Sequence, residues 1–569
     1  MSVDLVLLHA PSVYDFRQKT ILYGPISEQI PSSPIFEMYP IGFLSIAEYL
    51  ERAGYRVRIV NLAVRMLNNR NFNADKMIKR LGSPVFGIDL HWMVHCHGAI
   101  EVARIVKKYH PEAKVVVGGF SASYYYKELI EYPEIDYVLR GDSTEEPFRQ
   151  LMDCIMRGRE PEAVPNLVWR DSQGMVRENP FSYIPDDLSH VMVRHYANTL
   201  RSVIKYHDLA SYTPFKGWTQ YPITAVFTCR GCTQNCVICG GSAAAFRKFY
   251  NRGKTVFRSP ELVAGDIKQI ERFSNGPAFI LGDVRQAGEE YAYELFRLLQ
   301  KKGVKNQLIF EIFSPASRDF LRQMGLSSPN FCLEISPESH DPEVRRAEGR
   351  PYSSEALEQT LGDALDAGCG RLDVFLMIGL PKQTPQSVMD TIDYCGFLMD
   401  KFKGDKRLFL FIAPLAPFLD PGSLAFEQPE RYGYHVLFRT LAEHRQALLA
   451  PSWKYALNYE TDWMTRQQIV DTAYKAMMRL NQLKAKYGVI SRQMAEAENR
   501  RVEAAWEMVP IIDGILSGND PERELSHLRA KIDELNMSPA THWAELELPL
   551  GLIKVKFLRS LWSWATERI

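Results

Sequence analysis

Strand-like apolar runs recur along the first 150 residues and alternate with stretches of helical period. The strand-like runs are Val3–Leu8, Tyr55–Asn61, Val85–Leu90, Lys114–Val117 and Tyr137–Leu139, and the clearest helical stretches are Ile41–Ala53 and Ala99–Tyr109. Runs without polar alternation are typical of strands buried on both faces. The α/β order predicts a doubly wound parallel sheet of the Rossmann-like kind, which binds its ligand at the carboxyl ends of the strands.

The same alternation resumes at Tyr221 with six further strand-like runs. They are Thr224–Phe227, Ala278–Leu281, Leu308–Phe313, Phe331–Ile335, Leu372–Ile378 and Leu408–Ile412, with helical stretches such as Glu261–Phe273, Tyr291–Lys302 and Ser354–Ala367 between them. Six units fall short of the eight of a closed barrel. We therefore expect a partial (β/α)6 barrel.

Four regions follow from these patterns. We expect the first sheet domain over residues 1–150, a Pro-rich linker over 151–220 and the partial barrel over 221–425. The linker carries one expected hairpin, Leu167–Val176. Residues 426–569 are expected to be helical, because strand patterns stop near 430 and Arg466–Tyr487 and Met494–Met508 are amphipathic.

Composition narrows the class of protein. The 569 residues carry 68 basic and 68 acidic side chains, so no overall field attracts nucleic acid. No run approaches the length of a membrane span, and the N-terminus lacks the basic region of a signal peptide. Nine cysteines, four of them within residues 229–239, suit a metal site in a reducing cytoplasm better than a set of disulfides. These features predict a cytoplasmic protein that does not bind nucleic acid.

The cysteine-rich segment carries the strongest chemical signal. Cys232, Cys236 and Cys239 stand in C-x₃-C-x₂-C spacing directly after the first strand of the expected barrel. Three thiolates can bind three irons of a four-iron cluster and leave the fourth iron open. A zinc site would need a fourth ligand, and no second C-x₂-C or H-x₃-H pair lies nearby. Cys229 could in principle replace one of the three as a ligand, but its spacing to Cys232 does not fit the motif.

The cysteine motif and the strands that follow it resemble the radical S-adenosylmethionine (SAM) enzymes that carry an N-terminal cobalamin-binding domain. The resemblance covers about residues 1–425. It implies a 4Fe-4S cluster, SAM and cobalamin as cofactors. It also implies an external one-electron donor such as flavodoxin or ferredoxin, whose electron lets the cluster cleave SAM to a 5′-deoxyadenosyl radical.

The resemblance assigns the SAM contacts to the ends of the barrel strands. The candidates lie in Ile280–Asp283, in the third strand, in Leu333–Ser339 and just beyond it, and in Met377–Pro381; they are Gly282, Asp283, Glu311, Glu334, Ser336, Arg345 and Gly379. A cationic sulfonium with a zwitterionic tail needs carboxylate and backbone partners of this kind. For any single carboxylate, the alternative is a solvated loop acid.

In the N-terminal region the resemblance assigns cobalamin contacts to two glycine turns. These contain Gly118 and Gly119 in the first and Gly141 and Asp142 in the second. The usual Asp-x-His-x-x-Gly motif is missing, so we expect cobalamin to bind without a histidine on cobalt. The alternative is a domain that binds nothing and serves as a scaffold.

A histidine-rich stretch follows the third strand. His91, His95 and His97 suggest metal ligands, because a spacing of four residues puts the first two on one helical face. Without an acidic or cysteine partner in the motif, we favour polar surface or loop residues.

The resemblance implies an enzyme that functionalises an unactivated carbon of a small molecule, most often by methylation. In that scheme one SAM supplies a methyl group through cobalt and a second supplies the radical. A radical cyclisation or rearrangement with the same cofactors is the first alternative. A cobalamin or redox sensor is an alternative of another class, and the full set of barrel strands argues against it.

The last residues have two interpretations. Residues 549–569 place Leu550, Ile553, Phe557, Leu561 and Trp564 near one face of an expected helix, with basic residues beside them. Such a helix would contact a membrane surface peripherally, and the substrate would then be lipid-like. Packing of the apolar face on the chain's own domain is the favoured alternative.

Overall fold

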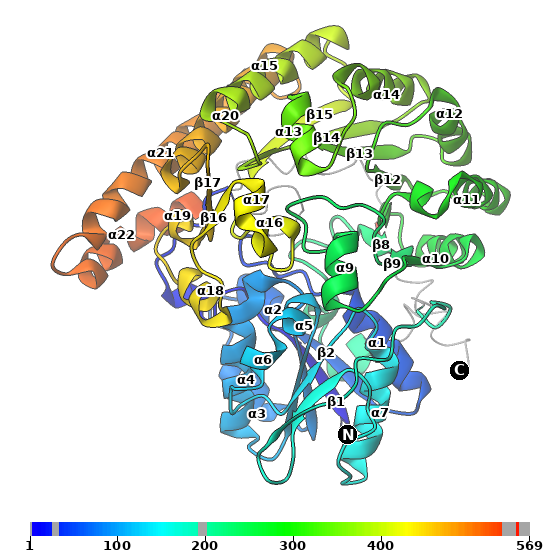
Figure 1. Ribbon diagram of the computed structural model, residues 1–569, viewed down its shortest axis with the longest axis vertical. Helices are drawn as coiled ribbons and strands as arrows, with labels where there is room; N and C mark the ends of the chain where they lie inside the picture. The colour runs from blue at the N-terminus through cyan, green and yellow to red at the C-terminus, as the bar shows by residue number, and fades with distance from the viewer. Residues whose placement is uncertain (1–2, 26–32, 192–201, 537–553, 557–569) are drawn as a thin grey trace.

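The computed structural model describes residues 3–25, 33–191, 202–536 and 554–556 (Figure 1). A seven-stranded sheet in the order β2-β1-β3-β4-β5-β6-β7 forms the N-terminal domain. The strands are β1 (Leu5–His9), β2 (Val57–Asn61), β3 (Val85–Asp89), β4 (Lys114–Gly118), β5 (Tyr137–Leu139), β6 (Leu167–Arg170) and β7 (Val176–Glu178). The first five pair in parallel, which confirms the expected doubly wound sheet.

Alternate residues of β1 enter two different cores, as the period of a strand requires. Leu5 and Leu7 pack with α1 (Ile41–Arg52) and α7 (Glu145–Met156), whereas Val6 and Leu8 join the larger core that includes α4 (Cys96–Tyr109). Both faces are therefore buried, and the carboxyl ends of the strands are the edge left for a ligand.

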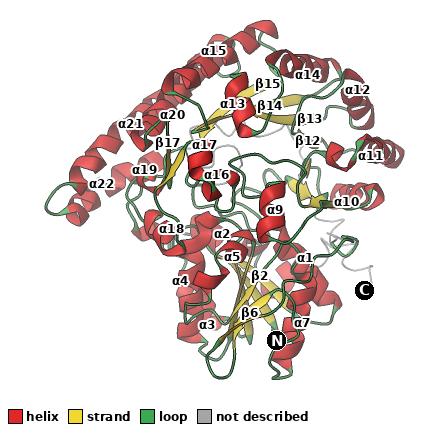
Figure 2. Ribbon diagram, in the orientation of Figure 1, coloured by secondary structure: helices red, strands yellow, loops and turns green. Residues whose placement is uncertain are grey.

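The second domain is a six-stranded parallel sheet in the order β15-β14-β13-β12-β11-β8, the expected partial barrel. Its strands are β8 (Thr224–Val226), β11 (Ala278–Ile280), β12 (Leu308–Ile312), β13 (Cys332–Glu338), β14 (Arg371–Ile378) and β15 (Leu408–Pro414). The helices outside it are α10 (Pro260–Phe273), α11 (Glu289–Lys302), α12 (Arg318–Ser327), α14 (Ser354–Asp366) and α15 (Pro385–Lys401) (Figure 2). Four of them begin after a capping side chain, Ser259, Ser317, Ser353 or Thr384.

The structure changes two expected boundaries. The hairpin β6–β7 pairs antiparallel with β5, so part of the expected linker belongs to the N-terminal sheet. The expectation that strands stop near residue 430 is wrong. A hairpin of β16 (Tyr434–Val436) and β17 (Tyr459–Thr461) follows the barrel, and strands this short carry no readable alternation.

Three long helices follow the hairpin: α20 (Arg466–Lys486), α21 (Arg492–Leu516) and α22 (Pro521–Asn536). Helix α20 packs on α15 and on the barrel edge strand β15. At the end of α22, Asn536 donates to the carbonyl of Ile21 at 2.7 Å, which ties this region to the N-terminal domain as well. No described helix has the length and apolarity that crossing a bilayer requires.

Most of the expected terminal helix lies outside the described residues. The described part, 554–556, is not helical. Val555 forms an antiparallel bridge with Ser274, and Lys556 donates its backbone N–H to Phe273 O at 2.7 Å. This stretch lies against the end of α10, so the expectation of one continuous helix over 549–569 is wrong here.

Candidate functional site

The three cysteines lie in one loop between β9 (Cys229–Arg230) and α9 (Ala243–Phe249). The Gln234 N–H points to the sulfur of Cys232, and the Gly241 N–H to that of Cys239, each at 3.3 Å. Backbone donors aimed at sulfur favour thiolate ligation and stabilise an iron–sulfur cluster. All three residues are partly exposed and lie in the same loop.

The three thiols are neighbours but do not form a site for one ion. Burial, with a smaller contribution from the nearby Cys232, raises the pKa of Cys236 to about 11. Burial, Asp420 and the other two thiols also raise the pKa of Cys239. Among the described residues, no three metal-binding side chains converge closely enough for a single ion. A four-iron cluster holds each thiolate on a separate iron, and this loop supplies three thiols for that purpose.

Cys229 occupies a different position. It lies within β9, where its backbone pairs with Phe257 of β10 (Val256–Phe257). Burial raises the pKa of its thiol to about 11. Its place in a strand, before the loop begins, supports the expected register.

Two expected SAM contacts, after the second barrel strand and within the third, are joined by a hydrogen bond from a backbone N–H to a carboxylate. Gly282 adopts φ +82° and donates its N–H to the Glu311 carboxylate at 2.9 Å. Asp283 accepts from Arg285 Nε at 3.0 Å and from the Phe313 N–H at 2.9 Å. The Asp283 carboxylate thus holds its own loop, and the Gly282–Glu311 pair is the part that remains for a ligand.

Glu334 is the expected contact with the most unusual surroundings. Burial, with Asp373 and Glu311 nearby, raises the pKa of Glu334 well above its usual range. No described residue forms a hydrogen bond with its carboxyl group. Ser336, two residues along β13, is half-buried on the same strand. A half-buried carboxyl group without a partner is suited to bind a polar ligand.

The structure does not support Arg345 as a SAM contact. Its guanidinium is fully buried and donates to the carbonyls of Ser339, His340 and Tyr352. It therefore braces its own segment.

Arg350, which the sequence patterns did not indicate, lies closer to the cysteine loop. Its Nη2 lies 3.1 Å from Glu338, and its charge lowers the pKa of Cys236, which burial raises. A positive charge at this place favours thiolate and the negative cluster.

Gly379 is fixed by residues of the unexpected hairpin. Its carbonyl accepts from Tyr434 Oη at 2.8 Å, and its N–H donates to Gln383 Oε1 at the same distance. At φ +98°, a Cβ here would lie 2.1 Å from Tyr459 Oη. Only glycine fits at this buried position, and both of its backbone groups are already hydrogen-bonded within the protein.

The two glycine turns of the N-terminal domain serve different purposes. A Cβ on Gly119 would lie 2.5 Å from His91 Cα, so this glycine lets the ends of β3 and β4 approach closely. In the second turn, Gly141 has φ +109° and precedes Asp142. The Asp142 carboxylate is buried against Arg252, with Nη2 to Oδ1 at 3.0 Å. Asp142 therefore joins the two domains and has little capacity left for cobalamin.

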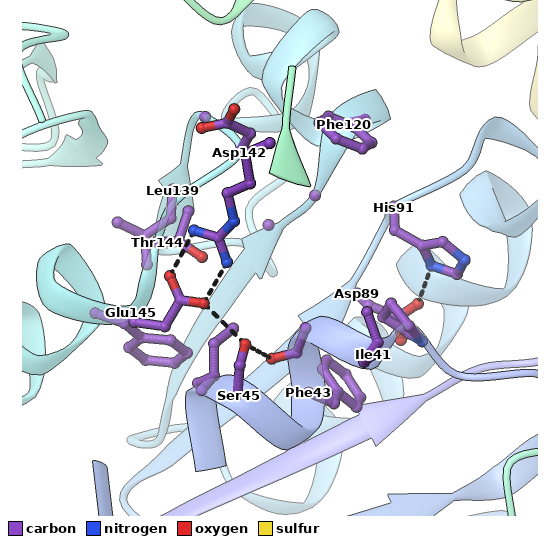
Figure 3. A pocket seen from close by; sticks show the side chains of 18 of the residues that line it. Ile41, Phe43, Ser45, Asp89, His91, Phe120, Leu139, Asp142, Thr144 and Glu145 are labelled. Atoms are coloured by element: carbon purple, nitrogen blue, oxygen red, sulfur yellow. Dashed lines mark hydrogen bonds and ion pairs between the residues drawn. The ribbon is translucent and has the colours of Figure 1, made fainter. Parts of the chain in front are cut away.

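A cavity of about 380 Å³ opens at the carboxyl edge of the N-terminal sheet (Figure 3). It reaches between the sheet and helices α1 and α7, where apolar side chains line it: Leu7, Ile41, Phe43, Val116, Leu139 and Phe148. The three glycines expected at the turns, Gly118, Gly119 and Gly141, lie in its wall, and so does Gly87 of β3. A narrow apolar space walled by glycine fits the flat ring and nucleotide tail of cobalamin.

Residues next to the cysteine loop line the same cavity. Cys229, Arg230 and Gly231 form part of its wall. Arg230 donates to the Glu145 carboxylate of α7, which also accepts from Ser45 at 2.8 Å. Burial raises the pKa of Glu145, but the charge and hydrogen bonds of Arg230, together with the Ser45 hydrogen bond, lower it to about 2. The cavity is thus shared by both domains and held by a buried ion pair.

The sequence patterns did not connect Asp89, a wall residue of the cavity, with His9. Asp89 lies at the end of β3 and accepts from His9 Nδ1 at 2.9 Å and from His91 Nδ1 at 2.7 Å. The favoured interpretation of the histidine stretch was wrong in part, because His95 and His97 are buried. No sequence motif could indicate this contact, because His9 and Asp89 are 80 residues apart in the chain.

Comparison with known families agrees with this arrangement. The profile of the B12 binding domain matches residues 33–151, and that of the Radical SAM superfamily matches residues 226–395. The chain is a radical SAM protein with a B12 binding domain. Both matched segments carry wall residues of the shared cavity.

This radical SAM protein is similar to one curated relative and to two solved structures. The hopanoid C-3 methylase of Methylococcus capsulatus is 27% identical over 277 residues, which are 48% of this chain and 47% of that protein. The chain thus matches about half the length of that relative. The radical SAM methyltransferase TsrM of Kitasatospora setae, solved with tryptophan and a SAM analogue, has a TM-score of 0.54 at 15% identity, covering 76% of this chain and 79% of TsrM.

The cobalamin-dependent radical SAM enzyme OxsB, solved with aqua-cobalamin and SAM, covers more of the chain. It aligns with 94% of this chain and 76% of its own, with a TM-score of 0.57 at 12% identity. At these identities the likeness establishes the fold alone.

Proposed function

We propose that this protein uses cobalamin, SAM and a 4Fe-4S cluster to methylate an unactivated carbon of a small-molecule substrate. The observation that carries the proposal is the shared cavity: Gly118 and Gly119 of the B12 binding domain and Cys229–Gly231 beside the cysteine loop line one space. A methyl donor and a radical source can act on one carbon only if they reach it from two sides of one site.

The chain's own residues supply binding and orientation. Cys232, Cys236 and Cys239 would hold the cluster. Gly282, fixed by Glu311 after β11, would contact SAM, and Gly379, fixed by Tyr434 after β14, would shape the loop at the same end of the sheet. When bound, the cluster supplies the electron that cleaves SAM and cobalamin supplies the transferable methyl group. An external one-electron donor of low potential completes the cycle.

Relatives support methylation over rearrangement. The hopanoid C-3 methylase and TsrM are both named for methyl transfer, and they differ in substrate: TsrM was solved with tryptophan. Because the match covers only part of the methylase, the proposal commits to the reaction and to a small-molecule substrate. Contact with a membrane forms no part of it.

Product analysis tests the proposal. Reconstituted protein, reduced anaerobically with dithionite and given SAM, should release 5′-deoxyadenosine, and Cys232→Ala should release none. S-adenosylhomocysteine should appear as well if the protein transfers methyl groups. A wild type that binds cofactors but forms neither product would favour a sensor, and 5′-deoxyadenosine alone would favour rearrangement.

A further inference from the structure

The tip of the cysteine loop reaches the protein surface. Residues 233–235, between the first two cluster cysteines, are exposed, and Cys232 and Cys236 on either side of them are partly exposed. A cluster held by these cysteines would therefore lie close to solvent at this tip. The external electron donor needs such a place, because a protein that carries electrons is too large to enter the barrel.

Helix α9 begins at this tip and carries two exposed basic residues. The backbone N–H groups of its first two residues donate to Gln234 O at 2.8 Å and to Asn235 Oδ1 at 2.9 Å. Arg247 and Lys248 follow one helical turn later and are exposed. Helix side chains lean toward the N-terminus and share a face with the residue four positions earlier, so both cations lie on the side of the loop tip.

The turn between α9 and β10 contributes a third cation. Lys254 is exposed in this turn, and the next residue, Thr255, packs against the start of the cysteine loop. A Cβ on Gly231 would lie 3.0 Å from Thr255 Cα, and Gly231 directly precedes Cys232. Lys254 therefore flanks the loop where its first cluster cysteine stands.

Helix α13 (Pro342–Glu348) contributes a fourth cation. Its end lies against the loop tip, because a Cβ on Gly349, the next residue, would lie 3.1 Å from Asn235 O. Arg346 lies in the last turn of this helix and is exposed. Three separate segments thus bring basic side chains to the edge of one loop, and we call these four residues the basic border.

Ion pairs neutralise little of the basic border. Among the described residues, none forms an ion pair with Arg247, Lys254 or Arg346. Lys248 pairs with Glu427 at 2.5 Å, yet its side chain stays 60% exposed. The whole chain has no net charge, so the basic border is a local feature that a partner can distinguish.

The remaining side of the loop tip is acidic. Gln286 Oε1 accepts the Thr233 N–H at 2.9 Å, and the exposed Glu289 and Glu290 follow at the start of α11. Cations on one side of the tip and carboxylates on the other favour one orientation of a charged partner.

We propose that the basic border is the docking surface of the electron donor, a small acidic redox protein of the flavodoxin or ferredoxin class. Opposite charges steer two proteins together and fix their orientation, which brings the donor's redox group to the loop tip. The donor then loses one electron and the cluster gains it; no bond forms or breaks and no proton moves. This inference rests on the proposed function, since it needs a cluster in the cysteine loop.

Rapid-freeze electron paramagnetic resonance of the reduced cluster tests the surface on the full chain, without SAM, cobalamin or substrate. The two reductants are reduced flavodoxin, an acidic protein, and reduced methyl viologen, a small cation that needs no docking surface. Arg247→Glu with Arg346→Glu should slow reduction by flavodoxin at least about tenfold at low ionic strength. Reduction by methyl viologen should not slow, and added salt should narrow the difference between the variant and the wild type with flavodoxin.

The matched control is Arg523→Glu with Lys531→Glu. Both residues are exposed on α22, which lies at the edge of the molecule, away from α9 (Figure 1). The change in net charge is the same, so repulsion by the whole protein is matched. This control should slow the flavodoxin reaction by less than about twofold, because charges beyond a Debye length are largely screened.

The outcomes separate this inference from the proposed function. An unchanged flavodoxin rate in Arg247→Glu with Arg346→Glu, or equal slowing in the control, would overturn the docking surface and leave the proposed function intact. If that variant loses its cluster, Arg247→Gln with Arg346→Gln removes the charges without reversing them and should slow the flavodoxin reaction alone. Equal slowing with methyl viologen would overturn the docking surface, and a wild type that assembles no cluster would overturn both proposals.

Discussion

Arg230 of β9 donates two hydrogen bonds to Glu145 of α7, at 3.0 and 2.5 Å, and both side chains are almost fully buried. The pair crosses the boundary between the B12 binding domain and the barrel, two residues before the first cluster cysteine. A second buried pair, Arg252 with Asp142, crosses the same boundary on the far side of the cysteine loop. The loop is thus fixed to the N-terminal domain at both ends.

Removing one partner should destabilise the protein strongly. Arg230→Met leaves Glu145 as a buried charge without its partner, which costs about 3–5 kcal/mol of unfolding free energy. Denaturant unfolding measures the loss. Arg297→Ala, which breaks an exposed helical pair with Glu294, is the control and should cost less than about 1 kcal/mol. A loss below 1 kcal/mol in Arg230→Met would contradict the buried pair.

The same pair predicts an acid-sensitive term in stability. The pKa of Glu145 falls from 4.5 to about 2 on folding, so its stabilisation is complete above pH 4.5 and is lost as the pH falls toward 2. The double variant Arg230→Met with Glu145→Gln should unfold with a flatter dependence on pH across this window. An unchanged slope would show that other carboxylates dominate.

Cluster assembly should require Cys232, Cys236 and Cys239 and should not require Cys229. Cys232→Ala, Cys236→Ala and Cys239→Ala should each lose the visible absorbance and most of the bound iron, because one iron then lacks its protein ligand. Cys229→Ala is the matched control, since this residue lies in β9 and its change should leave the iron content unaltered. If Cys229→Ala removes the cluster and Cys239→Ala keeps it, the register is wrong.

The Gly379 loop should reject any side chain. Gly379→Ala places a Cβ 2.1 Å from Tyr459 Oη, whereas Gly368→Ala, at a similar positive φ, meets no atom within 4 Å. Both changes carry the left-handed backbone cost of about 1–2 kcal/mol. Gly379→Ala should therefore destabilise the protein more than Gly368→Ala does, as denaturant unfolding measures. Adding Tyr459→Phe should recover part of the difference, and equal effects at both glycines would refute the close contact.

His444 should make the protein less stable in mild acid. Its Nδ1 donates to Thr440 O at 2.7 Å and its Nε2 accepts from Asn458, so the folded state holds it neutral. Burial lowers its pKa from 6.5 to about 4, so stability is complete above pH 6.5 and falls as the pH drops toward 4, by about 3 kcal/mol in all. Thermal unfolding of His444→Gln should show a weaker dependence across this range. A dependence as steep as the wild type's would assign the effect elsewhere.

The sequence predicted the long strands and helices well, and also the loop that carries the three cysteines. Buried strands such as β3 and β12 have apolar runs long enough to be recognised in the sequence. The spacing of the cysteines along the chain shows which thiols share a loop. The partners of side chains that meet only in the folded protein could not be predicted from the sequence. Arg345 and Arg350 are five residues apart, and only the folded chain shows that the first binds carbonyls and the second faces Glu338. The hairpin that holds Gly379 consists of two strands of three residues, too short for a period.

Methyl transfer through cobalamin is the central claim, and the S-adenosylhomocysteine yield with and without cobalamin tests it most directly. Protein with a reconstituted cluster is reduced anaerobically, given SAM, and compared in its cobalamin-free and cobalamin-loaded forms by mass spectrometry. We expect 5′-deoxyadenosine from both forms and S-adenosylhomocysteine from the loaded form alone. Equal S-adenosylhomocysteine from both forms, or none from the loaded form, would contradict a cobalamin-dependent methyltransferase.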